Sequence, residues 1–324
     1  MAADFTTNRG LSMQILFIVN EAAGNGKGKK VWHQLQKQLT IDYQVAFTEY
    51  EGHGQEIAKQ WAQQQQDKNL LIVVGGDGTI HEVFSGVVHN ELIIVGVVRA
   101  GSGNDFARYF PTFHNAQQIE DYVMTAAMAN AKIDAGKVQL GNRRDEIFVN
   151  NAGIGFDAYV TKSINTSRLK FYLNKIGLGK LSYAIAVSRG LFSFDCFNVT
   201  IRSGEEEWQF QRAWFVAMCN QPYFGGGMKI SPAAKADDGR VDITIVHDIS
   251  RIKLLLVFVT VFFEKHTKFK EITFLQGQHF DIIVNDDKID CHMDGNYSGS
   301  VQQGSIIHCT VQQNAWNIMT KSSK

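Results

Sequence analysis

Three glycines and an acidic residue stand where an apolar strand ends and a helix begins. The apolar run LLIVV at 70–74 is followed by Gly75-Gly76-Asp77-Gly78-Thr79, after which apolar residues recur at the spacing of one helix face. Glycine lets the backbone approach a ligand closely, and a helix N-terminus offers N–H groups and a partial positive charge to phosphate. Asp77 cannot bind phosphate by charge, so we expect it to hold Mg²⁺ or to orient a reacting group.

Two more loops of similar composition follow other predicted strands. The loop after the strand at 13–20 carries Gly24, Gly26 and Gly28 together with Lys27, Lys29 and Lys30, and RAGSGNDFAR at 99–108 follows the strand at 92–98. The first of these loops lacks the GxxxxGK[ST] pattern of a P-loop and matches G-x-G-x-x-G poorly. Because the carboxyl ends of parallel strands meet at one sheet edge, the three loops together favour a phosphate-binding cleft over three ordinary turns.

The elements that must position these loops alternate between strand and helix up to about residue 135. Continuous apolar strands alternating with helices are typical of a parallel sheet that is covered on both faces. After residue 133, short strands such as 197–202 and 241–246 alternate apolar with polar residues and are separated by glycine turns. This pattern indicates antiparallel sheet, so the 324 residues are expected to form two domains.

Composition and charge narrow the class of protein. Lys+Arg and Asp+Glu both number 32, so no global basic field suggests nucleic acid as a partner. The four cysteines form no CxxC pair, and we interpret them as reduced thiols of a cytoplasmic protein. There is no signal-peptide pattern, and the apolar run at 252–263 is shorter than the ~20 residues of a membrane span. We therefore expect a soluble protein without a transmembrane segment.

The motifs resemble those of the soluble diacylglycerol kinase and sphingosine kinase superfamily, in its bacterial lipid kinase form. The resemblance follows the order of the family's motifs along nearly the whole chain. It is carried by NEAAGNGK at 20–27, GGDGT at 75–79, GSGNDFA at 101–107, NNAGIGFDA at 150–158, SPAAKADDGRVDI at 231–243 and MDGN at 293–296.

The resemblance implies a kinase of α/β class with two domains that uses ATP and Mg²⁺ to phosphorylate a lipid hydroxyl, with diacylglycerol or a related lipid as first choice. The resemblance also implies that the protein takes part in phospholipid biosynthesis and lies in the cytoplasm, peripheral at the membrane surface. The sequence leaves the exact lipid and the oligomeric state, a homodimer included, open. The expected parts are a disordered extension at 1–12, a parallel-sheet nucleotide-binding (diacylglycerol kinase-like catalytic) domain at 13–135, a β-sandwich lipid-binding domain at 136–311, and a C-terminal segment at 312–324 that returns to the first domain.

The resemblance also implies site residues. Asp77 and Asp105 would organise Mg²⁺ or the base, and Asp294 would activate the lipid hydroxyl. A further Mg²⁺, structural or serving to dock another subunit, would be held by Lys235, Asp238 and Arg240, partly through carbonyl oxygens. Apolar residues at 177–192 and 252–263 would receive acyl chains or simply pack in the core. The nucleotide site would comprise Asn20, Glu21, Ala22, Ala23, Gly24, Thr48, Gly75, Gly76, Asp77, Gly78, Thr79, Ile80, His81 and Ser102.

The chain departs from the family pattern at a few positions. Glu21 replaces a proline of the first loop, and Asn25 replaces a lysine that some members carry. Asn296 replaces the glutamate of the D-G-E motif, and an amide cannot accept a proton at neutral pH. We expect Asp294 to be the base, with Asn296 hydrogen-bonding beside it. Two alternatives stay open: an NAD kinase-like enzyme, since those also carry GGDGT, and a degenerate kinase that binds nucleotide or lipid without efficient catalysis.

Overall fold

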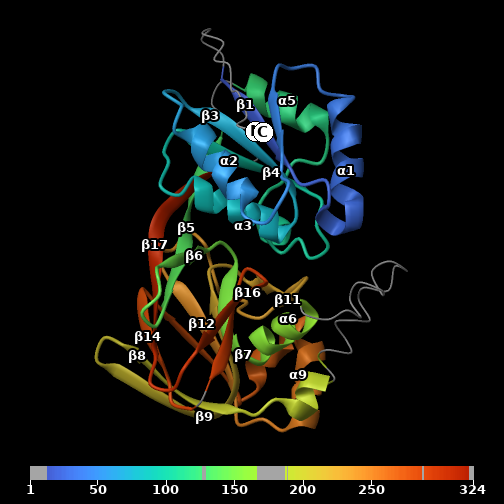
Figure 1. Cartoon of the computed structure of the whole chain (residues 1–324). Coiled ribbons are helices and arrows are strands. Elements are labelled where there is room, and N and C mark those ends of the chain that lie inside the picture. Colours follow the sequence, from blue (N-terminus) through green and yellow to red (C-terminus); the bar gives the residue numbers. More distant parts are fainter. Residues whose placement is uncertain (1–12, 126–128, 166–186, 188, 287, 321–324) are drawn as a thin grey trace. The chain divides into compact units, whose positions relative to one another are not determined.

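The chain divides into two compact units in the computed structural model (Figure 1). The first comprises Met1–Asp134 with Gln313–Lys324, and the second comprises Ala135–Gln312. The predicted disordered extension and most of the apolar segment at 177–192 lie outside the described residues. Within those residues, no helix has the length and apolar character needed to span a bilayer. The structure describes residues 13–125, 129–165, 187, 189–286 and 288–320.

The first unit is built on a parallel sheet in the order β17-β4-β3-β1-β2. Each of these neighbouring pairs runs parallel. All residues of β1 and β3 are buried, as expected of central strands covered on both faces. The predicted parallel sheet is therefore confirmed. Its strands are β1 (Ile15–Val19), β2 (Gln44–Phe47), β3 (Asn69–Gly75), β4 (Ile93–Arg99) and the C-terminal end of β17 (Ile306–Met319).

Successive side chains of a strand point to opposite faces of the sheet, so these continuously apolar strands make both faces apolar. Helices cover both of these faces. On one face, Trp32 of α1 and Ile119 of α5 share a core cluster with Phe17 and Ile72 of the sheet. On the other, α2 and α3 pack against each other, with α2 contacting β1 and α3 contacting β3 (Figure 1). The helices are α1 (Ala23–Gln36), α2 (His53–Ala62), α3 (Asp77–Gly86), α4 (Phe106–Tyr109) and α5 (Ala116–Met124).

The C-terminal end of β17 completes the first unit. Asn317 and Ile318 pair with β4, so the last described strand lies next to residues that precede it by more than 200 positions. The buried Trp316 donates its indole N–H to the carbonyl of Phe84 at 2.8 Å, and the two rings meet edge to face. This contact joins α3 to the C-terminal strand.

The second unit is an antiparallel β-sandwich around its own core. The long strand β9 pairs with β8 through its first half and with β7 and β12 through its second half. The predicted sandwich class is thereby confirmed. Its strands are β5 (Asn130–Leu140, of which the residues from Ala135 on belong to this unit), β6 (Glu146–Phe148), β7 (Asn151–Gly155), β8 (Phe197–Ser203), β9 (Glu206–Cys219), β10 (Tyr223–Phe224), β11 (Met228–Lys229), β12 (Val241–His247), β13 (Ile272–Gly277), β14 (His279–Val284), β15 (Ile289–Met293), β16 (Asn296–Val301) and the start of β17.

Helical segments complete the second unit. The helix α6 (Phe156–Asn165) follows β7 directly, and α9 (Arg251–Val261) follows β12. A short 3-10 helix at Lys265–Lys268 comes next in the chain and contacts α9. The side chains of Leu254, Val257 and Val261 belong to the core of this unit, so α9 is attached along one stripe.

Candidate functional site

The three glycine-rich loops of the first unit meet at the carboxyl edge of its sheet. They follow β1, β3 and β4. A methyl carbon on Gly24 would lie 2.4 Å from the carbonyl oxygen of Ala100, and one on Gly76 would lie 2.9 Å from the Cα of Gly101. Side chains at these contacts would collide with backbone, which explains why glycine stands there. The structure therefore brings the three sequence-predicted loops together.

Asn20 organises the first loop and connects it to the second. Its side-chain oxygen accepts the N–H of Ala23 at 3.1 Å, and its amide nitrogen donates to the Thr79 hydroxyl at 3.0 Å. Its own backbone N–H donates to Val74 at the end of β3. The next residues, Gly24 to Gly26, have positive φ and interrupt the helical backbone of α1. The first loop thus forms a fixed wrap of peptide groups beside the start of α3.

The N-terminus of α3 points its first peptide groups toward the loop cluster. Gly76 is the residue before the helix and has no side chain to cap it, and its carbonyl accepts the N–H of Ile80 at 3.0 Å. A helix leaves the N–H groups of its first turn without acceptors inside the helix, here those of residues 77–79. Together with the helix dipole, these groups suit a phosphate anion.

Asp77 connects the second loop to the third. Its carboxylate accepts the N–H of Phe106 at 3.1 Å, so it fixes the start of α4. Asp105, the neighbouring acid, is buried and lies 3.8 Å from the Arg108 guanidinium. Asn104 has positive φ and closes the third loop with two hydrogen bonds to the backbone of Gly101. The two predicted acids therefore come from adjoining loops of one unit.

The remaining predicted nucleotide residues differ in their exposure. Thr48 follows β2, and its N–H donates to Val19 at the end of β1. Ser102 is exposed in the third loop, and His81 is half-buried on α3. Ile80 is buried in the core, so only its backbone can reach a ligand. Their roles stay predictions.

Glu82 is a structural residue of this region that the sequence did not signal. Its two carboxylate oxygens accept the N–H groups of Gly52 and Gly54 at 2.9 and 3.0 Å. A methyl carbon on Gly54 would lie 2.8 Å from that carboxylate. Glu82 therefore anchors the beginning of α2 to α3. Its partners lie about 30 residues upstream, and no motif spacing connects them.

In the second unit, Asp294 lies in a tight hairpin turn between β15 and β16. Asp294 and Gly295 both have positive φ, as a two-residue turn of this hand requires. The buried carboxylate accepts backbone N–H groups from Val149, Asn150 and Asn151 at 2.8, 2.8 and 3.1 Å. It thereby fixes the turn to the segment that leads into β7.

Buried polar side chains surround this turn, and sequence reasoning missed them as a group. Asn220 donates to the carbonyl of Val149 at 2.9 Å, and Gln221 donates to the side chain of Asn150 at 3.1 Å. Most buried polar side chains make at least one hydrogen bond, and both of these amides do so. The family-like motif NNAGIGFDA at 150–158 is thus held in place by residues at the end of β9 as well as by Asp294.

A buried histidine and aspartate form a second contact beside β7. His292 lies 2.9 Å from Asp157, and both side chains are almost fully buried. A methyl carbon on Gly153 would lie 2.4 Å from the Asp157 carboxylate and 2.6 Å from the His292 ring. The last glycine before Ile154 is therefore needed for this pair to form. Asp157 belongs to the motif NNAGIGFDA, whereas its partner His292 lies just before the motif MDGN and was not predicted.

The D-D-G loop is exposed and adjoins a buried acid. Lys235, Asp238 and Arg240 are all exposed, and the carboxylate of Asp238 accepts the N–H of Arg240 at 3.1 Å. Gln276 donates to both Asp238 and Asp242, at 3.3 and 3.4 Å. Burial, with a smaller contribution from the charge of Asp238, raises the pKa of Asp242 to about 6. Two carboxylates therefore lie around one amide.

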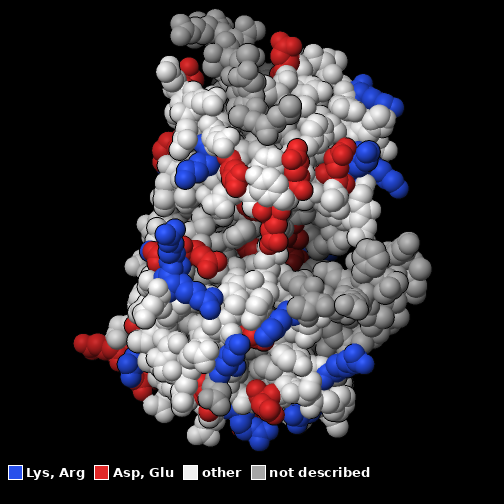
Figure 2. Space-filling view, viewed as in Figure 1, with Lys and Arg blue, Asp and Glu red and all other residues white. Residues whose placement is uncertain are grey.

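The surface carries charge of both signs. Figure 2 shows Lys and Arg side chains interspersed with Asp and Glu on the described part of one face. This distribution matches the equal numbers of basic and acidic residues in the sequence. On this face, the described residues therefore form no wide basic field.

Comparison with known proteins covers both units. Residues 14–138 match the family model of the diacylglycerol kinase catalytic domain, and residues 150–315 match that of the YegS C-terminal NAD kinase beta sandwich-like domain. The chain is 32% identical over 290 residues to "Putative lipid kinase YtlR" of Bacillus subtilis (strain 168), which covers 88% of this chain and 93% of the relative. It is 28% identical over 232 residues to a diacylglycerol kinase of Mycobacterium tuberculosis, 71% of each chain.

A solved structure agrees at the level of the fold. The crystal structure of a diacylglycerol kinase from Bacillus anthracis (strain Sterne) superposes with a TM-score of 0.66 at 19% identity, over 97% of this chain and 99% of that one. The family match spans both units and follows the order of the motifs along the chain. The chain therefore belongs to the family of bacterial diacylglycerol kinase-like lipid kinases.

Proposed function

We propose that this kinase transfers the terminal phosphoryl group of ATP, with Mg²⁺, to the hydroxyl of diacylglycerol or a related lipid. The observation that carries the proposal is the contact of three glycine loops around the start of α3 in a lipid kinase family. Phosphoryl transfer asks mostly for positioning and for neutralisation of charge. Backbone N–H groups of residues 22–26, apart from those of Ala23 and Gly26, which donate within the loop, and of residues 76–79 would position the phosphates.

The acids of the first unit supply a place for the metal. The carboxylate of Asp77 is ionisable, half-buried and held by the N–H of Phe106, and oxygen ligands are what Mg²⁺ prefers. When bound, Mg²⁺ would neutralise charge on the phosphates. Asp77 would hold it, and Asp105 would keep Arg108 and the third loop in position.

On the second unit we propose Asp294 as the group that accepts the proton of the lipid hydroxyl. Three backbone N–H groups keep its carboxylate in one orientation. A general base must lie within hydrogen-bond reach of the proton that it accepts. Asn296 begins β16 and is exposed, so its amide can hydrogen-bond a hydroxyl but cannot take its proton.

The D-D-G loop is proposed to hold a further Mg²⁺ that stabilises the second unit. Asp238 and carbonyl oxygens of Lys235 and Arg240 are hard oxygen donors, and Asp242 adds a nearby carboxylate. Burial disfavours the negative charge of Asp242 and raises its pKa to about 6. A cation at this loop would relieve that cost, so the residues fit the ion.

Association with a membrane surface is proposed to run through α9. One side of the helix belongs to the core. On its other side, Ile252 and Val259 are 77% and 62% exposed, and Phe263, just after the helix, is 69% exposed. An exposed apolar stripe of this kind indicates an interaction site. The residues that follow include exposed Lys265, Lys268 and Lys270. Apolar side chains bordered by lysines suit the interface of a membrane with anionic lipids.

Asp77→Asn keeps an oxygen for the N–H of Phe106 and removes the negative charge. We expect lipid phosphorylation to fall about 10²–10³-fold, as when one electrostatic group of a transition state is lost. The measurement is transfer of label from ATP to diacylglycerol, ceramide, sphingosine and phosphatidylglycerol in vesicles. Asp67→Asn, an exposed acid of the same unit, is the matched control. Wild-type turnover in Asp77→Asn would contradict the assignment.

The same assay separates the rival activities. Phosphorylation of NAD in place of every lipid would indicate an NAD kinase-like enzyme. Binding of ATP without transfer to any acceptor would indicate a degenerate kinase, and a large gain of turnover in Asn296→Glu would trace the deficit to that amide.

Asp294→Asn should lower turnover by about 10²–10⁴-fold if the carboxylate takes the proton, whereas Asn296→Ala should change turnover little. Both are assayed well below their unfolding temperatures, because loss of backbone hydrogen bonds also destabilises Asp294→Asn. If Asp294→Asn unfolds earlier but keeps wild-type turnover when folded, its carboxylate is an anchor of the turn and nothing more.

Asp242→Asn should stabilise the protein at neutral pH in metal-free buffer. The folded pKa of about 6 lies above the unfolded value near 3.9, so wild-type stability falls as pH rises from about 4 to 6. The variant lacks this loss and should gain roughly 1–2 kcal/mol in free energy of unfolding at pH 7.5, and almost nothing at pH 4. Urea titration measures this, with exposed Asp237→Asn as control. An equal gain in free energy of unfolding at pH 4 and at pH 7.5 would show that the buried charge of Asp242 is not the cause. Added Mg²⁺ should narrow the gap at pH 7.5.

Val259→Glu should weaken binding to vesicles of phosphatidylcholine and phosphatidylglycerol roughly tenfold, because burial of a valine side chain contributes ~1.5–3 kcal/mol. The measurement is cosedimentation with vesicles. Val45→Glu is the matched control, since Val45 is also exposed but lies on β2 of the first unit. Equal loss in both variants would mean that charge alone, and not α9, governs binding.

A further inference from the structure

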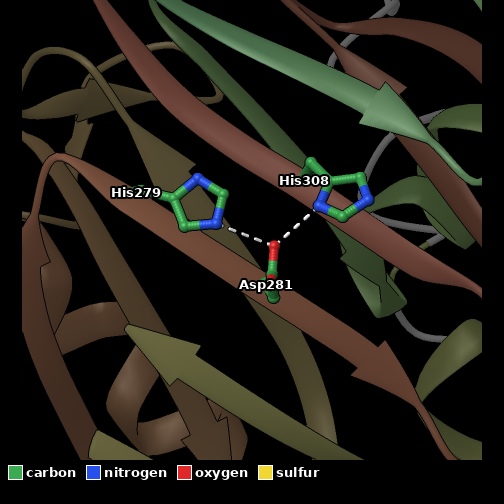
Figure 3. A group of neighbouring side chains, drawn as sticks. All are labelled: His279, Asp281 and His308. Carbon is green, nitrogen blue, oxygen red and sulfur yellow. Dashed lines mark hydrogen bonds and ion pairs between the residues drawn. The ribbon is translucent and has the colours of Figure 1, made fainter. Parts of the chain in front are cut away.

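Two histidines and an aspartate converge on the solvent-facing side of the second unit. Figure 3 shows the rings of His279 and His308 directed at the carboxylate of Asp281. His279 and Asp281 lie on β14, and His308 lies on β17. None of the three belongs to the loops or the turn assigned to phosphoryl transfer.

The strand register places the three side chains on one face. His279 and Asp281 are two residues apart, so their side chains point to the same side of the sheet. In the antiparallel pairing of β14 with β17, Asp281 stands directly opposite His308. Residues opposite each other across antiparallel strands have adjacent side chains. The convergence thus follows from backbone pairing and does not depend on a mobile loop.

The nitrogen and oxygen atoms lie at distances that an ion can bridge. The Nε2 of His279 is 2.9 Å from Oδ1 of Asp281, and the Nδ1 of His308 is 2.7 Å from the same oxygen. All three candidate ligand atoms fall within 4.8 Å of one another. Tetrahedral ligands at zinc bond lengths stand about 3.3 Å apart, so the carboxylate oxygen would move away from each ring nitrogen by less than about 1 Å. The two ring nitrogens would adjust from a separation of at most 4.8 Å.

Charge at this place does not oppose a cation. Arg202 on β8 stands opposite Asp281 on its other side, but its guanidinium is paired with Glu207 at 2.7 Å. The half-buried Asp281 and His308 and the exposed His279 leave the face open to water. Water can therefore complete the coordination of an ion held by three protein ligands.

We propose that His279, Asp281 and His308 form a binding site for a divalent ion of the zinc class, which clips β14 to β17. Two imidazole nitrogens and one carboxylate oxygen suit zinc and its transition-metal neighbours, whereas Mg²⁺ prefers oxygen ligands alone. The site is thus chemically distinct from the Mg²⁺ sites proposed for the kinase reaction. Bound to the folded pair of strands, the ion would stabilise the second unit.

The test uses the full chain freed of metal by a chelator and titrated with Zn²⁺ by calorimetry. We expect one ion per chain at this site and an affinity that declines on acidification, because the ligand atoms must be deprotonated to bind the ion. Zn²⁺ at about 100 times its Kd should raise the Tm by roughly 5 °C or more. Bound Co²⁺ should give the visible absorption bands of a site with a low coordination number, and Mg²⁺ should not compete with Zn²⁺ for the site.

Two variants and a control decide the outcome. His308→Gln and Asp281→Asn should each weaken zinc binding at least about tenfold, since even loss of an outer partner costs about 10–100-fold. Both should abolish the rise in Tm, whereas His114→Gln, an exposed histidine of the first unit, should behave as the wild type. If zinc binds wild type and His308→Gln alike, or fails to raise the wild-type Tm, the site does not exist. Neither result bears on lipid phosphorylation.

Discussion

The close contact of peptide backbones at Gly76 and Gly101 is the constraint on which the first unit depends. With a methyl carbon at either residue lying under 3 Å from the other's Cα, β3 and β4 can deliver their loops to the same place only as glycine loops. The Asn20 to Thr79 hydrogen bond then adds the first loop to the pair. The anion site predicted at this edge would thus consist of bare peptide groups, held in position by strands that are buried on both faces.

In the second unit, a carboxylate and not a glycine contact holds together segments that are distant in the chain. Three backbone N–H groups converge on Asp294, so a two-residue turn is joined to a segment about 145 residues earlier in the chain. Buried amides of Asn220 and Gln221 then fix that segment from its other side. A buried network of this kind is costly unless every member is satisfied, which favours one arrangement over its neighbours.

Much of this architecture could be predicted from the sequence because its signals are local. The apolar run of β3, the glycines after it and the periodic helix α3 are contiguous, and together they indicate the parallel sheet and its phosphate-suited edge. What could not be predicted depends on register between distant strands. Glu82 meets Gly52 and Gly54 across two helices, Asp242 meets Asp238 through Gln276, and His308 meets Asp281 only because β17 pairs with β14 in one alignment. Conversely, the roles predicted for the loop residues stay predictions, because position alone does not assign a ligand.

The membership of β17 in both units has a consequence for how the protein is made. Its start pairs with β14 in the second unit, and its end pairs with β4 in the first. During synthesis, most of the first unit leaves the ribosome early, yet Ile94 and Val95 at the edge of β4 lack their β17 partners until Asn317 and Ile318 appear. Open edges invite pairing with other chains. The sheet of the first unit can therefore be completed only after the second unit has been synthesised.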